Sequence, residues 1–472
     1  MLKLKDLYQL SGRIGRAPYA LWGSILFLIK YNLDRLISLS YGHSWFITDY
    51  FIQADRLGIL SLPEEDKPYY LTLLLASVPF IWVGTILSVR RLRDAGIHTA
   101  LVGLFFIPFL NAILFLILSL IPSTSAISEG NTKLSDFFNR FLPKSKVGSA
   151  AVAIGVLTLF GLPLMIFSVN IMGEYGWGLF VGIPFFLGMG SVLIYCHHEY
   201  RYIKECLSVS AISVLLFGGA LLFLALEGVL CLLMAAPLGL VIGMLGGLVG
   251  FSIQERGTKT AGTLFSFTWL MIPLLIFGEH TDGRQSEVVP VTTEVIIDAA
   301  PQAIWNELVA FSTIPEPKDW FFQTGIAYPT HAEIEGHGEE AVRYCNFTTG
   351  TFVEPIDIWD EPRLLRFSVL DQPPPLVESS PYEHLHLPHL ENYFVSEQGQ
   401  FLLEELPNGQ TLLSGTTWYR HEIWPAAYWH IWSNYILHKI HLRVLNHIKQ
   451  EAESKEGSQL PRDVNESSHD SQ

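Results

Sequence analysis

The chain has 472 residues, of which 50% are hydrophobic and only 16% are charged, with a mean hydropathy of +0.32. This is too apolar for a single soluble protein and too polar for a chain that lies in the membrane throughout, so we expect a composite. The net charge of −15 is unevenly placed: residues 1–280 carry about +3 and residues 281–472 about −18. An acidic soluble part repels phosphates, which excludes nucleic acid as its partner.

Apolar runs of about 20 residues, the length that crosses a bilayer, recur up to residue 280. No small-x-small cleavage site follows the first run, so we expect it to remain as an anchor. Lys30, Asp34 and Arg35 interrupt this run; the two neighbours Asp34 and Arg35 are expected to pair with each other or with another helix, and Lys30 to reach the headgroups. Glu227 is expected in a tight external turn, with an intramembrane carboxylate as the alternative. The eight predicted spans are Tyr19–Leu39, Tyr70–Val89, Thr99–Leu120, Val147–Met172, Trp177–Tyr195, Leu207–Leu226, Leu230–Ile253 and Ala261–Phe277.

Lysine and arginine counts distinguish two topologies, because these residues are retained in cytoplasmic loops. If all eight spans cross, about 7 of them lie inside and about 10 outside. If Thr99–Leu120 bends near Pro108 and Asn111 and leaves on the side it entered, the counts become about 15 and about 2. We therefore favour the second topology, which places the soluble domain outside the cytoplasm.

Two arginine motifs flank the first two runs, Ser11–Arg16 (SGRIGR) and Arg90–Gly96 (RRLRDAG). They resemble a bacterial inner-membrane family known only as domain of unknown function eight-oh-five, which usually has His where Arg93 stands. The resemblance covers residues 1–125, with further transmembrane helices over 126–280, and it implies no chemistry. Anionic lipid attracts headgroup-level arginines by about 1 kcal/mol each, so we predict topology anchoring, with a headgroup or partner site as the alternative. The residues concerned are Arg13, Arg16, Arg90, Arg91 and Arg93, with Asp94 as a pairing carboxylate.

Beyond a short polar linker at 281–290, residues 291–453 read as a soluble domain. It opens with the strand-like segment Val291–Asp298, and the helical pattern Ala300–Leu308 follows. A long helix from about Ala426 to Glu453 closes it, and the polar tail 454–472 is predicted to be disordered. Between these helices, turns marked by Pro, Gly and Asn408-Gly409 separate the strand-like stretches Ala341–Phe352, Arg363–Leu370, Gly399–Leu406 and Thr411–His421.

This order of elements resembles the START/polyketide-cyclase superfamily, often called SRPBCC. The resemblance implies an α+β helix-grip fold, in which a curved sheet wraps around the last helix with an apolar cavity between them. The scaffold hosts binders and enzymes alike, so it leaves the ligand open. The segment Gln372–Leu390, rich in Pro and His, is expected to act as a lid over the cavity mouth.

The last helix carries an aromatic and apolar stripe at helical spacing, in which the small Ser433 would leave room beside it. Such a stripe also forms plain core, and the pattern alone does not separate the two interpretations. The residues predicted to line or close a cavity are Trp305, Trp418, Trp429, Trp432, Ser433 and Ile436.

The sequence patterns that would indicate catalytic or metal-binding groups are weak. His438 and His441 share a helical face at a metal-ligand spacing, but a further ligand would have to come from the loop histidines His384, His386 or His389, so no metal is predicted. The acids Glu354, Asp357, Asp360 and Glu361 are interpreted as an exposed sheet rim. No nucleophile elbow, P-loop or dinucleotide glycine pattern occurs in the sequence, and no catalytic residue or cofactor is predicted.

These observations predict a multi-pass protein of the bacterial inner membrane, whose soluble domain captures a lipophilic small molecule or lipid near the bilayer. Membrane lipids are the expected surroundings of the helices. Two alternatives stay open: a cyclase-like enzyme that uses the same cavity, and a transporter formed by the membrane helices.

Overall fold

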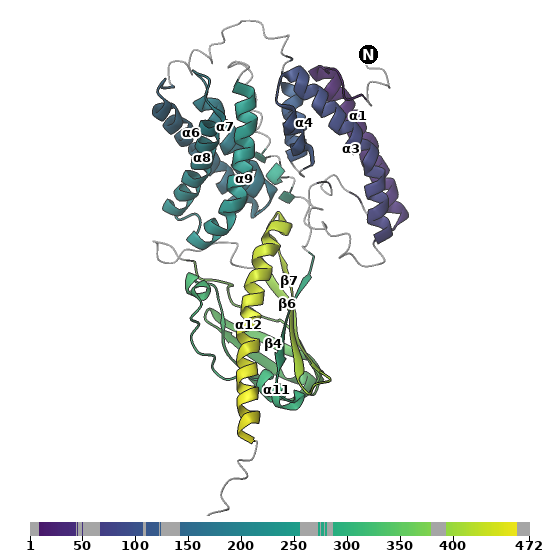
Figure 1. The fold of residues 1–472 in the computed structure, drawn as a ribbon, viewed down its shortest axis with the longest axis vertical. Helices are drawn as coiled ribbons and strands as arrows, with labels where there is room; N and C mark the ends of the chain where they lie inside the picture. Colours follow the sequence, from purple (N-terminus) through teal and green to yellow (C-terminus); the bar gives the residue numbers. More distant parts are fainter. Residues whose placement is uncertain are drawn as a thin grey trace, which may run out of the picture. The chain divides into compact units, whose positions relative to one another are not determined.

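The computed structural model divides the chain into two compact units. The helical unit comprises Met1–Glu227 and Cys231–Arg284 with the short segment Ile423–Tyr428, and the soluble unit comprises Gln285–Glu422 and Trp429–Gln472 with Gly228–Leu230. The division at 284/285 falls inside the predicted linker. The structure describes residues 9–43, 45, 50, 67–106, 110–121, 123, 142–254, 272–273, 275–277, 279–280, 287–378 and 393–459 (Figure 1).

The first part of the helical unit holds two long helices, α1 (Arg16–Ser40) and α3 (Lys67–Ala95), which pack against each other. Within α1, Asp34 is fully buried and pairs with Lys30, and it accepts a hydrogen bond of 2.5 Å from the hydroxyl of Tyr50. A buried carboxylate needs a cationic partner because its desolvation is expensive. The expected pairing of Asp34 with Arg35 was therefore wrong, and Lys30 lies in an ion pair four residues away on the same helix face.

The predicted span Thr99–Leu120 is divided into two short helices in the structure. The 3-10 helix η4 (Thr99–Phe106) and the helix α4 (Leu110–Leu120) pack against each other and against α3. At about 2.0 and 1.5 Å per residue, each is about 16 Å long, too short to cross a core of about 30 Å. The predicted interruption is confirmed, and re-entry on one side stays a prediction.

The second part is a bundle built around α7 (Ile183–Tyr195), nearly all of which is buried. Before it come α6 (Lys146–Ile166) and two π-helical segments, η6 (Phe167–Met172) and η7 (Gly178–Gly182). After it come α8 (Ile203–Phe223) and α9 (Val229–Gln254). A Cβ atom at Gly246 of α9 would lie 2.2 Å from the carbonyl oxygen of Phe185, so only glycine permits this helix contact. The predicted close packing at Gly246 is confirmed.

Within the residues that the structure describes, five helices are long and apolar enough to cross a membrane: Lys67–Ala95, Lys146–Met172, Gly178–Tyr195, Ile203–Phe223 and Val229–Gln254. They confirm a multi-pass helical membrane part. Of the other three predicted spans, the first forms α1 but holds three charged residues, the third is divided, and the eighth lies largely outside the described residues.

The soluble unit is built on a seven-stranded antiparallel sheet in the order β1-β7-β6-β5-β4-β3-β2. The last strand of the sequence pairs with the first and with its own hairpin partner, and register shifts in three strand pairs help the sheet to curl. The strands are β1 (Val289–Ile297), β2 (Pro329–Glu335), β3 (Val342–Phe347), β4 (Gly350–Asp360), β5 (Leu364–Ser368), β6 (Phe394–Glu405) and β7 (Thr411–His421).

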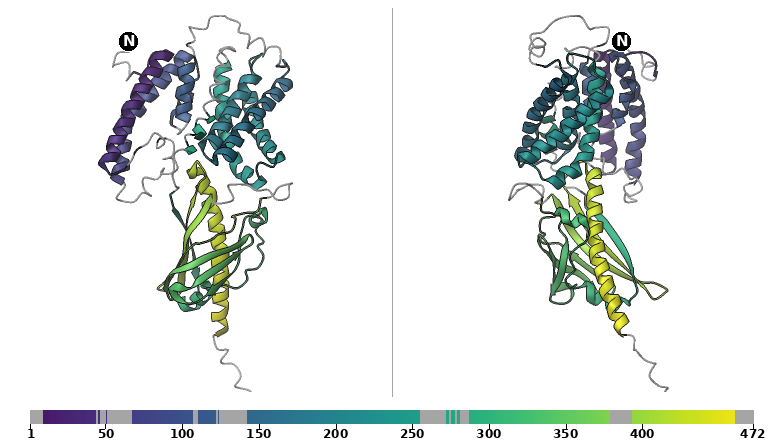
Figure 2. Two further views of the ribbon diagram at one scale, coloured as in Figure 1. Left: turned by 180° about the vertical axis from the view of Figure 1, so that it is seen from behind. Right: turned by 60° about the vertical axis from the view of Figure 1, so that its left-hand side comes forward.

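A single long helix, α12 (Ala426–Gln459), lies along one face of this sheet (Figure 2). Its C-terminal half packs on an apolar core that includes Leu445, Ile448 and residues of the short helix α11 (Pro301–Leu308). The 3-10 turns η8 (Trp320–Thr324) and η9 (Gly338–Glu340) complete the unit. The predicted helix-grip arrangement is confirmed.

Several predicted element boundaries in the soluble unit need correction. The stretch Ala341–Phe352 is a hairpin, because it turns at Thr348-Thr349-Gly350, and strand β2 was missed. The helix predicted to end at Glu453 continues to Gln459, where Lys455 pairs with Glu307 at 2.6 Å. The part of the predicted tail from residue 460 onward lies outside the described residues, as do positions 379–390 of the predicted lid.

Candidate functional site

The face of the sheet that meets α12 is set by the alternation of side chains along β7. Gly415 lies against Leu445 of α12, the hydroxyl of Thr417 contacts His441, and the hydroxyl of Tyr419 contacts His430. Successive strand residues point to opposite faces, so these odd-numbered residues share the face toward the helix. The layer between β7 and α12 therefore changes from apolar at one end to polar at the other.

Tyr419 is the centre of one half of this polar region. Its side chain is fully buried, and its hydroxyl lies 2.9 Å from Nδ1 of His430 and donates to Oδ1 of Asn434 at 2.7 Å. The ring of His421, also buried, lies 4.4 Å from that of His430. Asn434 is exposed, so the group of hydrogen bonds runs from the buried hydroxyl outward to solvent.

The other half joins β1 to the middle of α12 through hydroxyl groups. The Thr293 hydroxyl lies 2.6 Å from Nδ1 of His438 and 3.0 Å from Nδ1 of His441. The Thr417 hydroxyl lies 2.8 Å from Nε2 of His441, so both ring nitrogens of His441 have a hydroxyl partner. We call the set Thr293, Thr417, Tyr419, His430, Asn434, His438 and His441 the polar network.

Burial determines the protonation states in the polar network. Burial lowers the pKa of His441 to about 4, and the electrostatic interaction with the neighbouring His438 contributes a smaller part of this decrease. Burial also lowers the pKa of His430 and raises that of Tyr419. At neutral pH the two imidazoles are uncharged and the phenol keeps its proton. His430, His441 and Tyr419 therefore offer neutral donors and acceptors, which suit an uncharged polar group of a ligand.

A second feature of the same sheet is a buried ion pair. Arg343 of β3 and Glu354 of β4 are cross-strand partners with relative exposures of 2% and 6%, and their side chains form a salt bridge. The guanidinium lies 5.3 to 5.6 Å from the ring centroids of Phe311, Phe367 and Phe401. The interpretation of Glu354 as part of an exposed rim was therefore wrong, because its side chain faces the core and is held there by an arginine.

The predicted cavity residues do not form one group. Trp305 is core, since it is buried and packs edge-on against Trp359 at 5.6 Å. Trp418 lies on the face of β7 opposite to Thr417 and Tyr419, where the guanidinium of Arg366 is 5.7 Å from its ring. Sequence reasoning missed the residues of β7 that do face the helix, although strict alternation from the buried Leu413 would have found them.

The four predicted residues of α12 do not share one environment. Trp429 is buried, Trp432 and Ser433 are half-buried, and Ser433 lies near the hydroxyl of Tyr419. Ile436 packs with Phe321 and Phe322 in a separate apolar cluster on another side of the helix. Ser433 therefore lies next to a buried polar group, and a cavity beside it stays a prediction.

The histidines that might have bound a metal are engaged with hydroxyls. His438 and His441 share the single Thr293 hydroxyl, and within the described part of the soluble unit they belong to no group of three ligand atoms from His, Cys, Asp or Glu. His384, His386 and His389 lie outside the described residues.

The arginine motif of the helical unit has a structural role that its sequence did not reveal. Arg91 is fully buried; its guanidinium donates to the carbonyl oxygens of Leu118, at 2.8 Å, and Ile121, and it pairs with Asp94 at 2.5 Å. The pairing expected for Asp94 is confirmed. Arg91 thus binds the last carbonyls of α4, where a cation also complements the helix dipole.

The other arginines of the two motifs differ in exposure. Arg90 is buried next to Gly12, whereas Arg93 is exposed and donates to the carbonyl of Leu10. Arg13 and Arg16 are exposed. Headgroup anchoring stays a prediction for the exposed Arg13, Arg16 and Arg93. For Arg91 we replace it by the binding of carbonyl oxygens at the end of α4.

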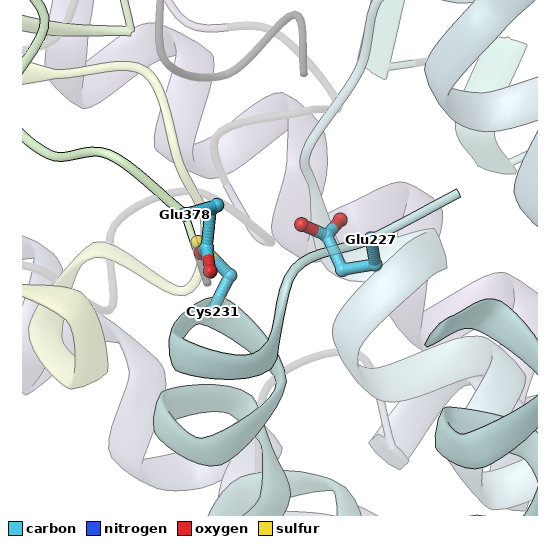
Figure 3. A group of neighbouring side chains, drawn as sticks. All are labelled: Glu227, Cys231 and Glu378. Atoms are coloured by element: carbon cyan, nitrogen blue, oxygen red, sulfur yellow. The ribbon is translucent and has the colours of Figure 1, made fainter. Parts of the chain in front are cut away.

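Figure 3 shows the surroundings of Glu227, which follows α8 in the turn before α9, with Cys231 on the first helical turn of α9. The turn is confirmed, but the Glu227 side chain is buried at 8% exposure rather than external. Glu378, also labelled there, belongs to the soluble unit.

Comparison with known sequences places one region of the chain. Residues 7–129 match the family described as "Protein of unknown function (DUF805)", which confirms the resemblance of the N-terminal region. No curated protein sequence matches the chain.

Solved structures similar to part of the chain align with its C-terminal region. XoxI from Bacillus cereus has 14% identity, covers 36% of this chain and 98% of that chain, and has a TM-score of 0.24. An aromatase/cyclase from Streptomyces sp. R1128 has 14% identity, coverages of 36% and 96%, and a TM-score of 0.25. A norcoclaurine synthase from Thalictrum flavum has 11% identity, coverages of 37% and 99%, and a TM-score of 0.24. At such identities, no activity of these proteins transfers to this chain.

Proposed function

We propose that the soluble unit is a membrane-tethered binding module for a lipophilic molecule that carries an uncharged polar group. The observation that supports this is the polar network between β1, β7 and the N-terminal half of α12. A layer that served only stability would be filled with apolar side chains, as it is around Leu445 and Ile448. Ligand sites combine an apolar lining with a few convergent polar groups, and the neighbouring Val291, Leu437 and Phe394 supply apolar surface here.

Protonation favours binding over acid/base catalysis at this site. A catalytic acid or base works best with a pKa near the working pH. Burial moves the pKa of Tyr419 upward and that of His441 down to about 4, both away from neutrality. The hydroxyl and imidazole groups therefore act as fixed hydrogen-bond partners, which would orient a hydroxyl or carbonyl group of the bound molecule.

We further propose that the protein lies in a bacterial inner membrane with the soluble unit on the non-cytoplasmic side. The lysine and arginine counts support this placement, since only a non-crossing Thr99–Leu120 segment gives about 15 inside and about 2 outside. The division of that segment into η4 and α4, each too short to cross, is compatible with it. A ligand would then be collected from the outer leaflet or the space beyond it.

Small molecules that co-purify with the full chain test the binding function. The chain is purified, extracted with organic solvent and analysed by mass spectrometry, alongside Ser433→Phe, which places a large ring next to Tyr419. Ile431→Phe serves as the matched control, because Ile431 of the same helix is 65% exposed. We expect a lipophilic compound that Ser433→Phe loses and Ile431→Phe retains.

A third variant tests the polar anchor. Tyr419→Phe removes one hydroxyl and its hydrogen bonds to His430 and Asn434, so retention should fall up to about tenfold, since a net hydrogen bond is worth about 1 kcal/mol. Equal retention in all variants, or no extractable compound from the parent chain, would contradict the proposed function.

A further inference from the structure

A groove of about 580 Å³ runs along the helical unit between α6 and α8. Its lining is almost entirely apolar and includes Ala150, Ile154, Gly155 and Leu216. Two polar side chains, Lys146 at the first residue of α6 and Tyr195 at the last residue of α7, line it as well. The groove therefore has an apolar lining along its length and a cation and a hydroxyl group at one end of the bundle.

Further cations gather at that same end. The segment before α6 and the segment between α7 and α8 are joined there, because Nε2 of His198 lies 2.8 Å from the carbonyl of Leu142 and Lys146 pairs with Glu205 at 2.5 Å. Lys144 and Lys204 are exposed and form no ion pair with any described residue. The positive charge at the groove end is thus only partly neutralised from within the unit.

The surroundings of the groove indicate a lipid environment rather than an aqueous one. Tyr200 and Tyr202, close in sequence to Lys204, are 58% and 73% exposed, as aromatic side chains at a membrane interface are. Along the same helices, Leu159 of α6 and Leu215 of α8 are also exposed. An exposed apolar helix surface next to interfacial tyrosines and lysines is the setting in which phospholipids lie.

We propose that this groove is a specific site for an anionic phospholipid. One acyl chain lies along Ala150, Ile154, Gly155 and Leu216, and the phosphate is held by Lys146, with Lys144 and Lys204 close in sequence to the groove end. Basic pockets between transmembrane helices bind anionic headgroups in this way. The site belongs to the helical unit alone and is independent of the binding function proposed for the soluble unit.

Occlusion of the groove tests the site. A Cβ atom added at Gly155 meets no atom within 4 Å, and the same is true of Gly219 on α8, which does not line the groove. Gly155→Leu should fill the groove without a clash, and Gly219→Leu is its matched control. The full chain is reconstituted in nanodiscs of equal phosphatidylglycerol and phosphatidylethanolamine, released into detergent, and the bound lipids are counted by native mass spectrometry.

The parent chain and Gly219→Leu should retain phosphatidylglycerol, whereas Gly155→Leu should lose it at least tenfold. Lys146→Gln should keep a bound lipid but lower the preference for phosphatidylglycerol about fivefold, the value of one lysine near an anionic headgroup; Lys318→Gln, which removes an exposed lysine of the soluble unit, is its control. Equal retention by Gly155→Leu and Gly219→Leu, or an equal preference in Lys146→Gln and Lys318→Gln, would overturn the site. Neither result bears on Ser433→Phe, so the two proposals fail separately.

Discussion

Removal of the carboxylate charge at position 354 should open the soluble unit. Glu354→Gln leaves the Arg343 guanidinium, at 2% exposure, among three phenylalanine rings without an anion. The guanidinium keeps its hydrogen bond to the carbonyl of Val309, at 3.2 Å from Nε, and its interaction with the uncharged thiol of Cys345. Loss of one member of a buried ion pair costs roughly 3–5 kcal/mol, because the other charge stays desolvated. At about 1.4 kcal/mol per factor of ten, the open population should rise between about a hundredfold and several thousandfold.

The thiol of Cys345 reports this opening in the full chain. It lies two residues from Arg343 on the same strand, is buried and free, and should react with iodoacetamide only when the sheet opens. Peptide mass spectrometry gives the labelling rate of this one cysteine, and the rate in denaturant gives the fully open reference. The ratio of the two rates is the opening equilibrium constant.

The control is an ion pair of the same sheet that is exposed. Arg363 and Asp360 lie 2.7 Å apart with side-chain exposures of 65% and 46%. Such pairs contribute about 0–1 kcal/mol, so Asp360→Asn should change the labelling rate less than about fivefold. The double variant Arg343→Met with Glu354→Leu should recover most of the loss, because apolar replacement of a buried pair is often neutral.

A Glu354→Gln rate within about fivefold of the parent would refute the reasoning, since it would mean that the guanidinium is solvated or finds another anion. A double variant as open as the single variant would assign the loss to packing rather than to unpaired charge.

Three further outcomes are expected. Because the folded pKa of His441 is about 4 and the unfolded value about 6.5, the unfolded state binds more protons between these values, so amide-exchange protection of β1 and β7 should fall by about 3 kcal/mol as the pH drops from 6.5 to 4; constant protection would contradict a neutral imidazole in the folded state. Arg91→Gln removes hydrogen bonds to the end of α4 and should lower amide protection there by about 2–3 kcal/mol, whereas the exposed Arg93→Gln should not; equal effects would remove the special role of Arg91. A reporter that works only outside the cytoplasm should be active when fused after Gln459, and a reporter that works only in the cytoplasm should be inactive there. Activity of the cytoplasmic reporter alone would show that Thr99–Leu120 crosses the membrane.

The sequence by itself determined the features that depend on local pattern. Apolar runs near 20 residues identified the helices of the membrane part, because hydrocarbon tolerates only helices with satisfied backbones. Lysine and arginine counts, together with Pro108 and Asn111 near the middle of the run, predicted a bend within Thr99–Leu120, where the structure has the separate helices η4 and α4. The strand Thr411–His421 was predicted to the residue by its composition and flanking turn.

What only the tertiary structure decided was which side chains meet. Arg343 and Glu354 are eleven positions apart, and neither residue carries a local mark of burial; a hairpin places them side by side under three rings that come from other segments. The sequence alone suggests that Arg91 is a surface anchor, whereas in the structure its guanidinium binds carbonyl oxygens at the end of α4. Trp418 and Tyr419 are neighbours in sequence but point to opposite faces of β7. Which of these two faces α12 covers depends on the pairing of β7 with β1 and on the path by which the chain returns to the sheet as α12. Burial of charge and convergence of polar groups arise from contacts between distant segments, so composition and spacing cannot specify them.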